Sequence, residues 1–386
     1  MIAGPTPAVP GDAPRVSFAR VLRLASVAFC GVLPAVVVVL IFVGTIQDSA
    51  VAMDFRQFYG AAEAILRGET PYGRATESLT AWGGPYPYPP LPALAAAPLT
   101  LLALQTAGLL VMAMLVLAAL AVPYVLGVRD WRCYGLVLLW PGVISAIQTG
   151  NLTLWFALAA AIAWRFRTRL LTPSIAIGLT LAAKFFLWPL AVWLVATRRF
   201  LAAALSLVVG AGLIVLSWAV TGFSGFLDYP ELLRTLERTV GGDSYTTYIV
   251  GLDLGLPSPV SRTLWLALGI ALLAAIVLVG RRGDERSAFI LAIAASLALS
   301  PIVWLHYFAL LAVVVALAQP ALGVLWFVPL AMIVTPGSGH PTPFQTSATL
   351  VVAAVTIALA LRASLRTARS GDSLGTASMR SLPGAA

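Results

Sequence analysis

The stretch LASVAFCGVLPAVVVVLIFVGTI (Leu24–Ile46) carries no charged residue and follows Arg15, Arg20 and Arg23. A helix that crosses a lipid bilayer needs about 20 consecutive apolar residues, so this run predicts a membrane-spanning helix. A cleaved signal peptide is the alternative, but the apolar region of such a peptide is about 7–15 residues long. The length of the run therefore favours a span that stays in the membrane.

The composition extends this prediction to the whole chain. Of the 386 residues, 60% are hydrophobic and only 10% are charged, whereas a soluble domain carries roughly 25% charged residues. Cys30 and Cys133 lie in or beside apolar runs, and no Cys/His spacing is typical of a metal site. The sequence therefore predicts a polytopic membrane protein without a disulfide framework.

Further apolar segments follow the first along the chain. They cover roughly 93–127, 133–147, 150–164, 170–183, 186–197, 200–220, 259–280, 287–300, 303–318, 321–335 and 344–361. With Leu24–Ile46 they predict an all-α polytopic membrane protein with a bundle of about twelve transmembrane helices, several of them short or tilted. This bundle forms one domain, 24–361, between a disordered N-terminal segment, 1–23, and a basic C-terminal segment, 362–386.

The charges predict the orientation of the chain. If the N-terminus is cytoplasmic, most of the 24 basic residues fall in short cytoplasmic loops, and most of the 15 acidic residues fall outside. This distribution follows the positive-inside rule. The net charge of +9 is then explained by topology, and no nucleic-acid partner is needed. We expect a plasma-membrane protein with both termini in the cytoplasm and two long outer loops, about 48–92 and about 221–258.

The second outer loop contains LDYPELLRTLERTV (Leu227–Val240). In this stretch Tyr229, Leu232, Leu233, Leu236 and Val240 fall on one helical face. An amphipathic pattern of this kind predicts a helix that lies along the membrane interface.

Polar residues gather at the predicted outer ends of the spans. They are Asp54 after the first span, Gln148 and Asn151 in AIQTGN, Lys184 in AAKFFLWP, and Trp304, His306 and Tyr307 in LSPIVWLHYF. They lie together only if the helices form one bundle. Each also has an ordinary alternative: a solvated loop acid, a turn cap, a lysine that extends to the headgroups, or a member of the interfacial aromatic belt.

The spans themselves contain almost no ionisable residues. A proton-coupled transporter normally carries such residues near the bilayer centre. An enzyme that acts at the outer surface is therefore favoured over a transporter or a lipid flippase. A scaffold protein of the cell envelope is a third reading, in which the outer polar residues have no chemical role.

Five motifs occur in a characteristic order: DFRQFYGAAEAILRGETPY, YPYPPLPALAAAPLTLL, IQTGN, KFFLWPL and SPIVWLHY. Through them the chain resembles glycosyltransferase family 87, and in particular the actinobacterial polyprenyl-phosphomannose-dependent α-1,2-mannosyltransferases. The resemblance implies a GT-C-type helical bundle and a sugar donor joined to a prenyl chain through one phosphate. An arabinofuranosyltransferase of mycobacterial cell walls is similar over the same motifs, so the sugar stays open.

The resemblance also implies roles for particular residues. Asp54 matches the catalytic aspartate of the first outer loop, His306 a histidine of the family, and Lys184 a basic residue. Asp54 is expected to act as general base. Lys184 and the catalytic candidate His306, assisted by Arg56 and Arg262, are expected to stabilise the negative charge of the donor phosphate. A contact of His306 with the sugar is the alternative.

The remaining candidates are polar and aromatic residues expected to bind the sugar or the acceptor. They are Gln148, Asn151, Tyr59, Trp82, Tyr86, Tyr88, Trp304 and Tyr307. No Asp-x-Asp motif occurs in an outer loop, so neither a metal nor a cofactor is expected. The expected partners are the lipid-linked donor, a glycolipid or glycan acceptor, and membrane lipids.

Overall fold

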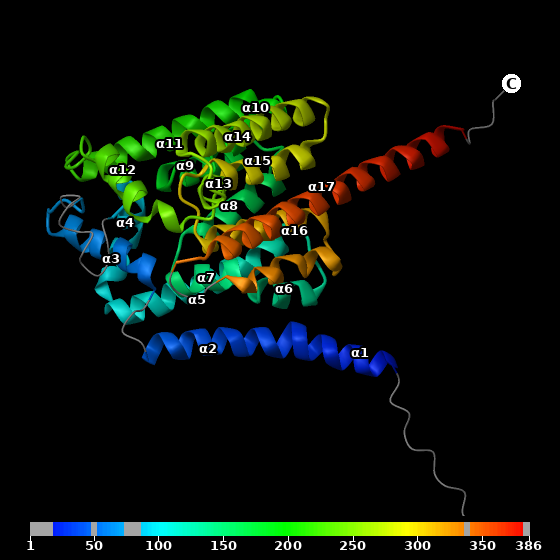
Figure 1. The fold of residues 1–386 in the computed structure, drawn as a ribbon, viewed down its shortest axis with the longest axis horizontal. Helices are drawn as coiled ribbons and strands as arrows, with labels where there is room; N and C mark the ends of the chain where they lie inside the picture. The colour runs from blue at the N-terminus through cyan, green and yellow to red at the C-terminus, as the bar shows by residue number, and fades with distance from the viewer. Residues whose placement is uncertain (1–17, 48–51, 73–85, 336–339, 381–386) are drawn as a thin grey trace, which may run out of the picture.

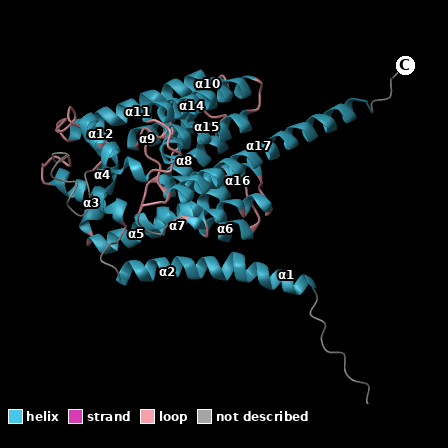
Figure 2. Cartoon of the chain, in the orientation of Figure 1, coloured by secondary structure: helices cyan, strands magenta, loops and turns pink. Residues whose placement is uncertain are grey.

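The computed structural model describes residues 18–47, 52–72, 86–335 and 340–380, with side chains up to 366. Within these ranges every regular element is a helix and no strand occurs (Figure 2). The prediction of an all-α protein is confirmed. Trp82 lies outside the described residues.

Some helices coincide with a predicted apolar segment, whereas other segments are divided into two or more shorter helices. In chain order the helices are α1 (Phe18–Val27), η1 (Ala28–Val32), α2 (Leu33–Gln47), α3 (Met53–Leu66), α4 (Pro90–Ala96), η2 (Ala97–Leu101), α5 (Leu104–Val125), α6 (Trp131–Leu138), α7 (Pro141–Thr149), α8 (Thr153–Arg165), α9 (Leu171–Ala183), α10 (Pro189–Ala196), α11 (Phe200–Val220), α12 (Tyr229–Val240), η3 (Gly241–Asp243), α13 (Thr247–Asp253), α14 (Ser258–Arg281), α15 (Glu285–Leu299), η4 (Leu305–Leu310), α16 (Leu311–Ala318), η5 (Val324–Trp326), η6 (Val328–Val334) and α17 (Pro343–Arg380).

Several helices are long and apolar enough to cross a membrane. In the described part of the chain there are five: Ala19–Gln47, Leu104–Val125, Phe200–Val220, Ser258–Arg281 and Pro343–Arg366. The pair α7 and α8 makes a sixth if it is counted as one span, although the two helices are bent by 118°. The chain is therefore a multi-pass membrane protein by length and composition.

Proline and short turns explain why the other apolar segments are shorter than expected. The segment predicted at 93–127 is divided into α4, η2 and α5, because Pro98 lies near the start of η2 and Leu102 and Ala103 are extended. The segment at 321–335 contains only the 3₁₀ helices η5 and η6. The predicted count of about twelve spans is therefore not confirmed, because only five or six helices of the described part of the chain are long and apolar enough to cross a membrane.

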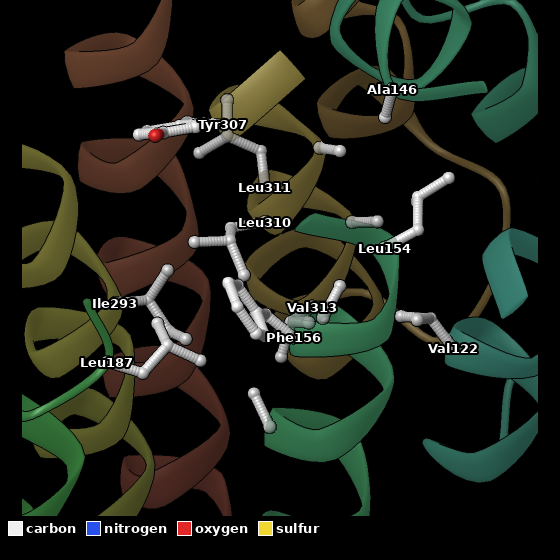
Figure 3. Packing of buried hydrophobic residues seen from close by; sticks show 14 of the residues in the cluster. Val122, Ala146, Leu154, Phe156, Leu187, Ile293, Tyr307, Leu310, Leu311 and Val313 are labelled. Atoms are coloured by element: carbon white, nitrogen blue, oxygen red, sulfur yellow. The ribbon is translucent and has the colours of Figure 1, made fainter. Parts of the chain in front are cut away.

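The core of the bundle is formed by α8, α15, η4 and α16. All eight residues of α16 are buried, and so are most of those in α15. Figure 3 shows Phe156 of α8 beside Leu310 and Val313, which come from η4 and α16. These central helices carry small and branched apolar residues, and this composition permits close packing.

The helices at the two ends of the chain lie at the periphery (Figure 1). The continuous helix α1–η1–α2 runs along one side of the bundle and contacts α6, where a Cβ at Gly135 would overlap the Cys30 carbonyl. The last helix, α17, extends away from the bundle toward the C-terminus. Most apolar side chains of α2 face outward, as expected for contact with lipid.

One end of the bundle is held together by an ion cluster. Glu285 at the start of α15 accepts from Arg167 after α8 (3.1 Å) and from Arg199 before α11 (2.7 Å). The indole of Trp193 donates to the Glu285 carbonyl. The α8, α10, α11 and α15 regions are thereby joined at the end that carries the arginine-rich loops.

Candidate active site

The helix α7 determines where the polar residues of the site meet. It ends at Gly150, whose φ of 68° favours glycine. A Cβ at Gly150 would lie 2.7 Å from the Cβ of Phe55 and 3.0 Å from that of Ala52. This close approach places the end of α7 against the first turn of α3, which contains Asp54.

The other end of α7 packs against η4 through a second glycine. A Cβ at Gly142 would lie 3.0 Å from the Ala309 nitrogen and 3.1 Å from the Leu305 oxygen. The same helix therefore contacts the segments that carry Asp54 and His306. The His306 Nε2 lies 3.9 Å from the Asp54 Oδ2, and it has no hydrogen-bond partner among the described residues.

Asn151 fixes the Asp54 carboxylate in one orientation. The Asn151 Oδ1 accepts hydrogen bonds from the nitrogen (2.9 Å) and the hydroxyl (2.6 Å) of Thr153. Its amide nitrogen must then point the other way, and it donates to the Asp54 Oδ2 at 2.6 Å. Burial raises the pKa of the Asp54 carboxyl, while the Asn151 hydrogen bond and the charge of Lys184 oppose this shift.

Lys184 lies directly after α9, where the backbone becomes extended. Its Nζ donates to the Tyr307 hydroxyl and lies 4.5 Å from the centre of the Tyr307 ring and 5.1 Å from that of Tyr88. The faces of aromatic rings stabilise such an ammonium group. The lysine is held in place by neutral groups, so its charge remains available to an anion.

Asp54, Asn151 and Lys184 line one cavity of about 800 Å³. Its polar end contains Asp54, Asn151, Lys184, Tyr88 and Tyr307, with Trp304 nearby in the wall. Most of the other lining residues are apolar and come from membrane helices and α12; they include Leu181, Ile214, Trp218, Leu233, Leu236, Val240 and Leu299. An amphipathic molecule with an anionic group and an apolar chain matches this lining.

The sequence model of glycosyltransferase family 87 matches residues 86–305 of the chain. The chain belongs to glycosyltransferase family 87. The predicted family is thereby confirmed, and with it a membrane glycosyltransferase that acts on a sugar donor and an acceptor. No curated protein and no solved structure matches the chain. The matched range contains Tyr88, Asn151 and Lys184; Asp54 precedes it and His306 follows it.

The predicted site residues of this glycosyltransferase fall into three groups by their position relative to the cavity. Six of them line the cavity: Asp54, Tyr88, Asn151, Lys184, Trp304 and Tyr307. His306 is buried behind Asp54, with 7% of its side chain exposed against 24% for Asp54. The others that the structure describes do not line the cavity: Arg56, Tyr59, Tyr86, Gln148 and Arg262.

Hydrogen bonds and position explain why these residues lie elsewhere. The Tyr59 hydroxyl donates to the Leu102 carbonyl (2.8 Å), so it joins α3 to η2. The Tyr86 hydroxyl donates to the Pro89 carbonyl (2.8 Å) and accepts from the Ala93 nitrogen, which shapes the aromatic loop. Gln148 is exposed on α7, and Arg262 lies over the Tyr248 ring.

The aromatic loop before α4 forms a wall of the cavity. The hydroxyl of Tyr72 donates to the Tyr88 carbonyl (2.8 Å), and that of Tyr229 donates to the Pro87 carbonyl (2.9 Å). The Tyr72 ring also stacks on Trp218 of α11. Tyrosines from distant parts of the chain thus hold Tyr88 beside Lys184.

Six polar residues of the cavity wall were not predicted from the sequence: Gln57, Arg234, Glu237, Thr239, Ser296 and Ser300. Gln57 follows Asp54 by one helical turn, so it lies on the same face of α3. The sequence therefore contained the information needed to predict Gln57 as a site residue. Arg234 and Glu237 lie on α12, and only the folded structure brings that helix over the cavity.

We expect Gly150→Ala to disturb the site through the packing of α7. The positive φ and the short contacts with α3 make a methyl group costly, by about 1–3 kcal/mol. Thermal unfolding in detergent should show a lower Tm, together with reduced glycosyl transfer. Gly60→Ala is the matched control, because a Cβ at Gly60 meets nothing within 4 Å and alanine is favoured in a helix. A Gly150→Ala protein as stable and active as wild type would contradict this account.

Proposed function

We propose that this chain transfers a mannosyl residue from polyprenyl-phosphate-mannose to a glycolipid or cell-envelope glycan on the outer face of the plasma membrane. The transfer inverts the anomeric centre and forms an α-1,2 linkage. One observation carries the proposal: a half-buried carboxylate, Asp54, and a lysine, Lys184, line the same cavity between apolar membrane helices. The lysine matches a phosphate, and the apolar walls match a prenyl chain.

The reaction follows from these positions. Asp54 accepts the proton of an acceptor hydroxyl as its oxygen bonds to the anomeric carbon. The bond from that carbon to the phosphate oxygen breaks, and the phosphate leaves with the electron pair. The Lys184 ammonium stabilises the growing negative charge on the phosphate. The transition state has oxocarbenium character, as in other glycosyl transfers.

The direction of three helices supports an outer position of the cavity. α8 (Thr153–Arg165) begins two residues after Asn151 and ends at Arg165, and α9 (Leu171–Ala183) begins two residues after Arg169 and ends next to Lys184. α11 begins next to Arg199 and reaches the cavity at Trp218. The cavity ends of these helices are thus opposite their arginine ends, which the positive-inside rule assigns to the cytoplasm. We propose the same orientation for the complete bundle of about twelve spans, with both termini inside.

A panel of synthetic donors and acceptors tests the function. Purified protein in lipid nanodiscs is mixed with polyprenyl-phosphate-mannose or polyprenyl-phosphate-arabinofuranose and with mannosylated lipids, and products are measured by mass. Product from the mannose donor supports the proposal. Product from the arabinose donor alone would replace it by arabinofuranosyl transfer. No product from either, with movement of the donor between leaflets, would favour a flippase.

We expect Asn151→Ala to change the pH dependence of transfer. A general base acts only when it is deprotonated, so the rate rises with pH through the pKa of Asp54. Loss of the Asn151 hydrogen bond raises that pKa further, and the acid limb of the rate profile should move to higher pH. Gln148→Ala, an exposed amide on the adjacent turn, should leave the profile unchanged. A lower rate with an unmoved acid limb would show that Asn151 does not act through Asp54.

A further inference from the structure

Glu237 lies on the cavity side of α12. Leu233 precedes it by four residues and Val240 follows it by three, so the three side chains share one face of the helix. All three line the cavity. Glu237 is exposed, and Leu232 is the buried residue of this helix. The Glu237 carboxylate is therefore open to a ligand in the cavity.

The Glu237 carboxylate also differs from the other charged groups of α12. Arg234 is paired with Glu231 at 3.1 Å, and Arg238 lies 3.9 Å from the same carboxylate. Within the described part of the chain, Glu237 has no hydrogen-bond or ion-pair partner for its side chain. Both of its oxygens are therefore free to accept hydrogen bonds.

The charges of the cavity divide it between two kinds of ligand group. Lys184 and Tyr307 provide hydrogen-bond donors at the polar end of the cavity, and these suit the phosphate of the sugar donor. A carboxylate on α12 repels a phosphate but accepts hydrogen bonds from hydroxyl groups. The transfer needs a second substrate in the same cavity, and that substrate carries hydroxyls.

We propose that Glu237 binds hydroxyl groups of a neutral sugar on the acceptor, and that α12 is thereby the acceptor-binding wall of the cavity. This inference rests on the proposed glycosyl transfer and adds the acceptor class and its binding residue. The acceptor binds along α12, with its reacting hydroxyl directed toward Asp54.

The test separates the kinetics of the two substrates. Initial rates are measured with the donor that wild type uses, varying first octyl α-D-mannopyranoside as acceptor and then the donor. Hydrolysis of the donor by water is measured without acceptor. We expect Glu237→Gln to raise the acceptor KM about tenfold or more, the size of a hydrogen bond to a charged group. The donor KM and the hydrolysis rate should stay unchanged.

Glu231→Gln is the matched control. It removes the same charge from the same helix and does not line the cavity. It breaks two exposed ion pairs, with Arg234 and Arg238, and such pairs contribute little. Its acceptor KM should equal that of wild type. An unchanged acceptor KM in Glu237→Gln, or a raised donor KM, would overturn the assignment of Glu237. Wild-type protein that transfers to no acceptor would refute the proposed function, and the assignment with it.

Discussion

The Asp54→Asn protein should fold normally and transfer sugar about 10²–10⁴-fold more slowly than wild type, the usual contribution of a general base. Asparagine has nearly the same shape as aspartate, and its carbonyl can accept the hydrogen bond from Asn151. The amide cannot take a proton from the acceptor hydroxyl. The loss should therefore appear in kcat, while the donor KM changes little.

The control for Asp54→Asn is Glu63→Gln on the same helix. Glu63 does not line the cavity, so this change removes a carboxylate from α3 without touching the site. Thermal unfolding of both variants establishes that the fold is kept, and product formation is followed by mass. An Asp54→Asn enzyme within a few-fold of wild type would remove Asp54 from the mechanism. Asp54→Glu should be intermediate, because its carboxylate is displaced by one methylene.

The Lys184→Gln protein should lose about 10²–10³-fold in turnover, the usual effect of removing one group that stabilises developing negative charge. Glutamine has no charge to offer the leaving phosphate, so the donor KM should rise as well. Lys184→Arg keeps the charge but in a planar group of different reach, and it should restore only part of the activity. Arg238→Gln, which removes an exposed cation of α12 outside the cavity, serves as the control.

The composition of the chain allows a second test of Lys184 without mutation. Lys184 is the only lysine of the sequence. Acetylation of the intact protein should remove its charge and abolish transfer, whereas reductive methylation, which keeps the charge, should have a smaller effect. Bound donor should protect Lys184 from both reagents. Full activity after complete acetylation of Lys184 would show that the phosphate is bound elsewhere.

The sequence by itself determined the class of protein and the segments that carry the chemistry. The length of Leu24–Ile46 and the rarity of charge specify a membrane protein, since both are local properties of the chain. Asp54, Asn151 and Lys184 could be selected because each interrupts an apolar pattern at the end of a predicted span. The amphipathic pattern of Tyr229–Val240 also predicted the helix α12 correctly.

Only the tertiary structure decided which of these residues meet. The hydrogen bond from Asn151 to Asp54 joins residues 97 positions apart, and it depends on the glycine contacts at both ends of α7. The same helix carries Gln148 outside the cavity, whereas contacts of Tyr229 with Pro87 and Trp218 place α12, and with it Glu237, on the cavity wall. Local patterns show that a residue is polar and near a span end. They do not show which way it faces, because that direction is fixed by close packing between helices distant in sequence.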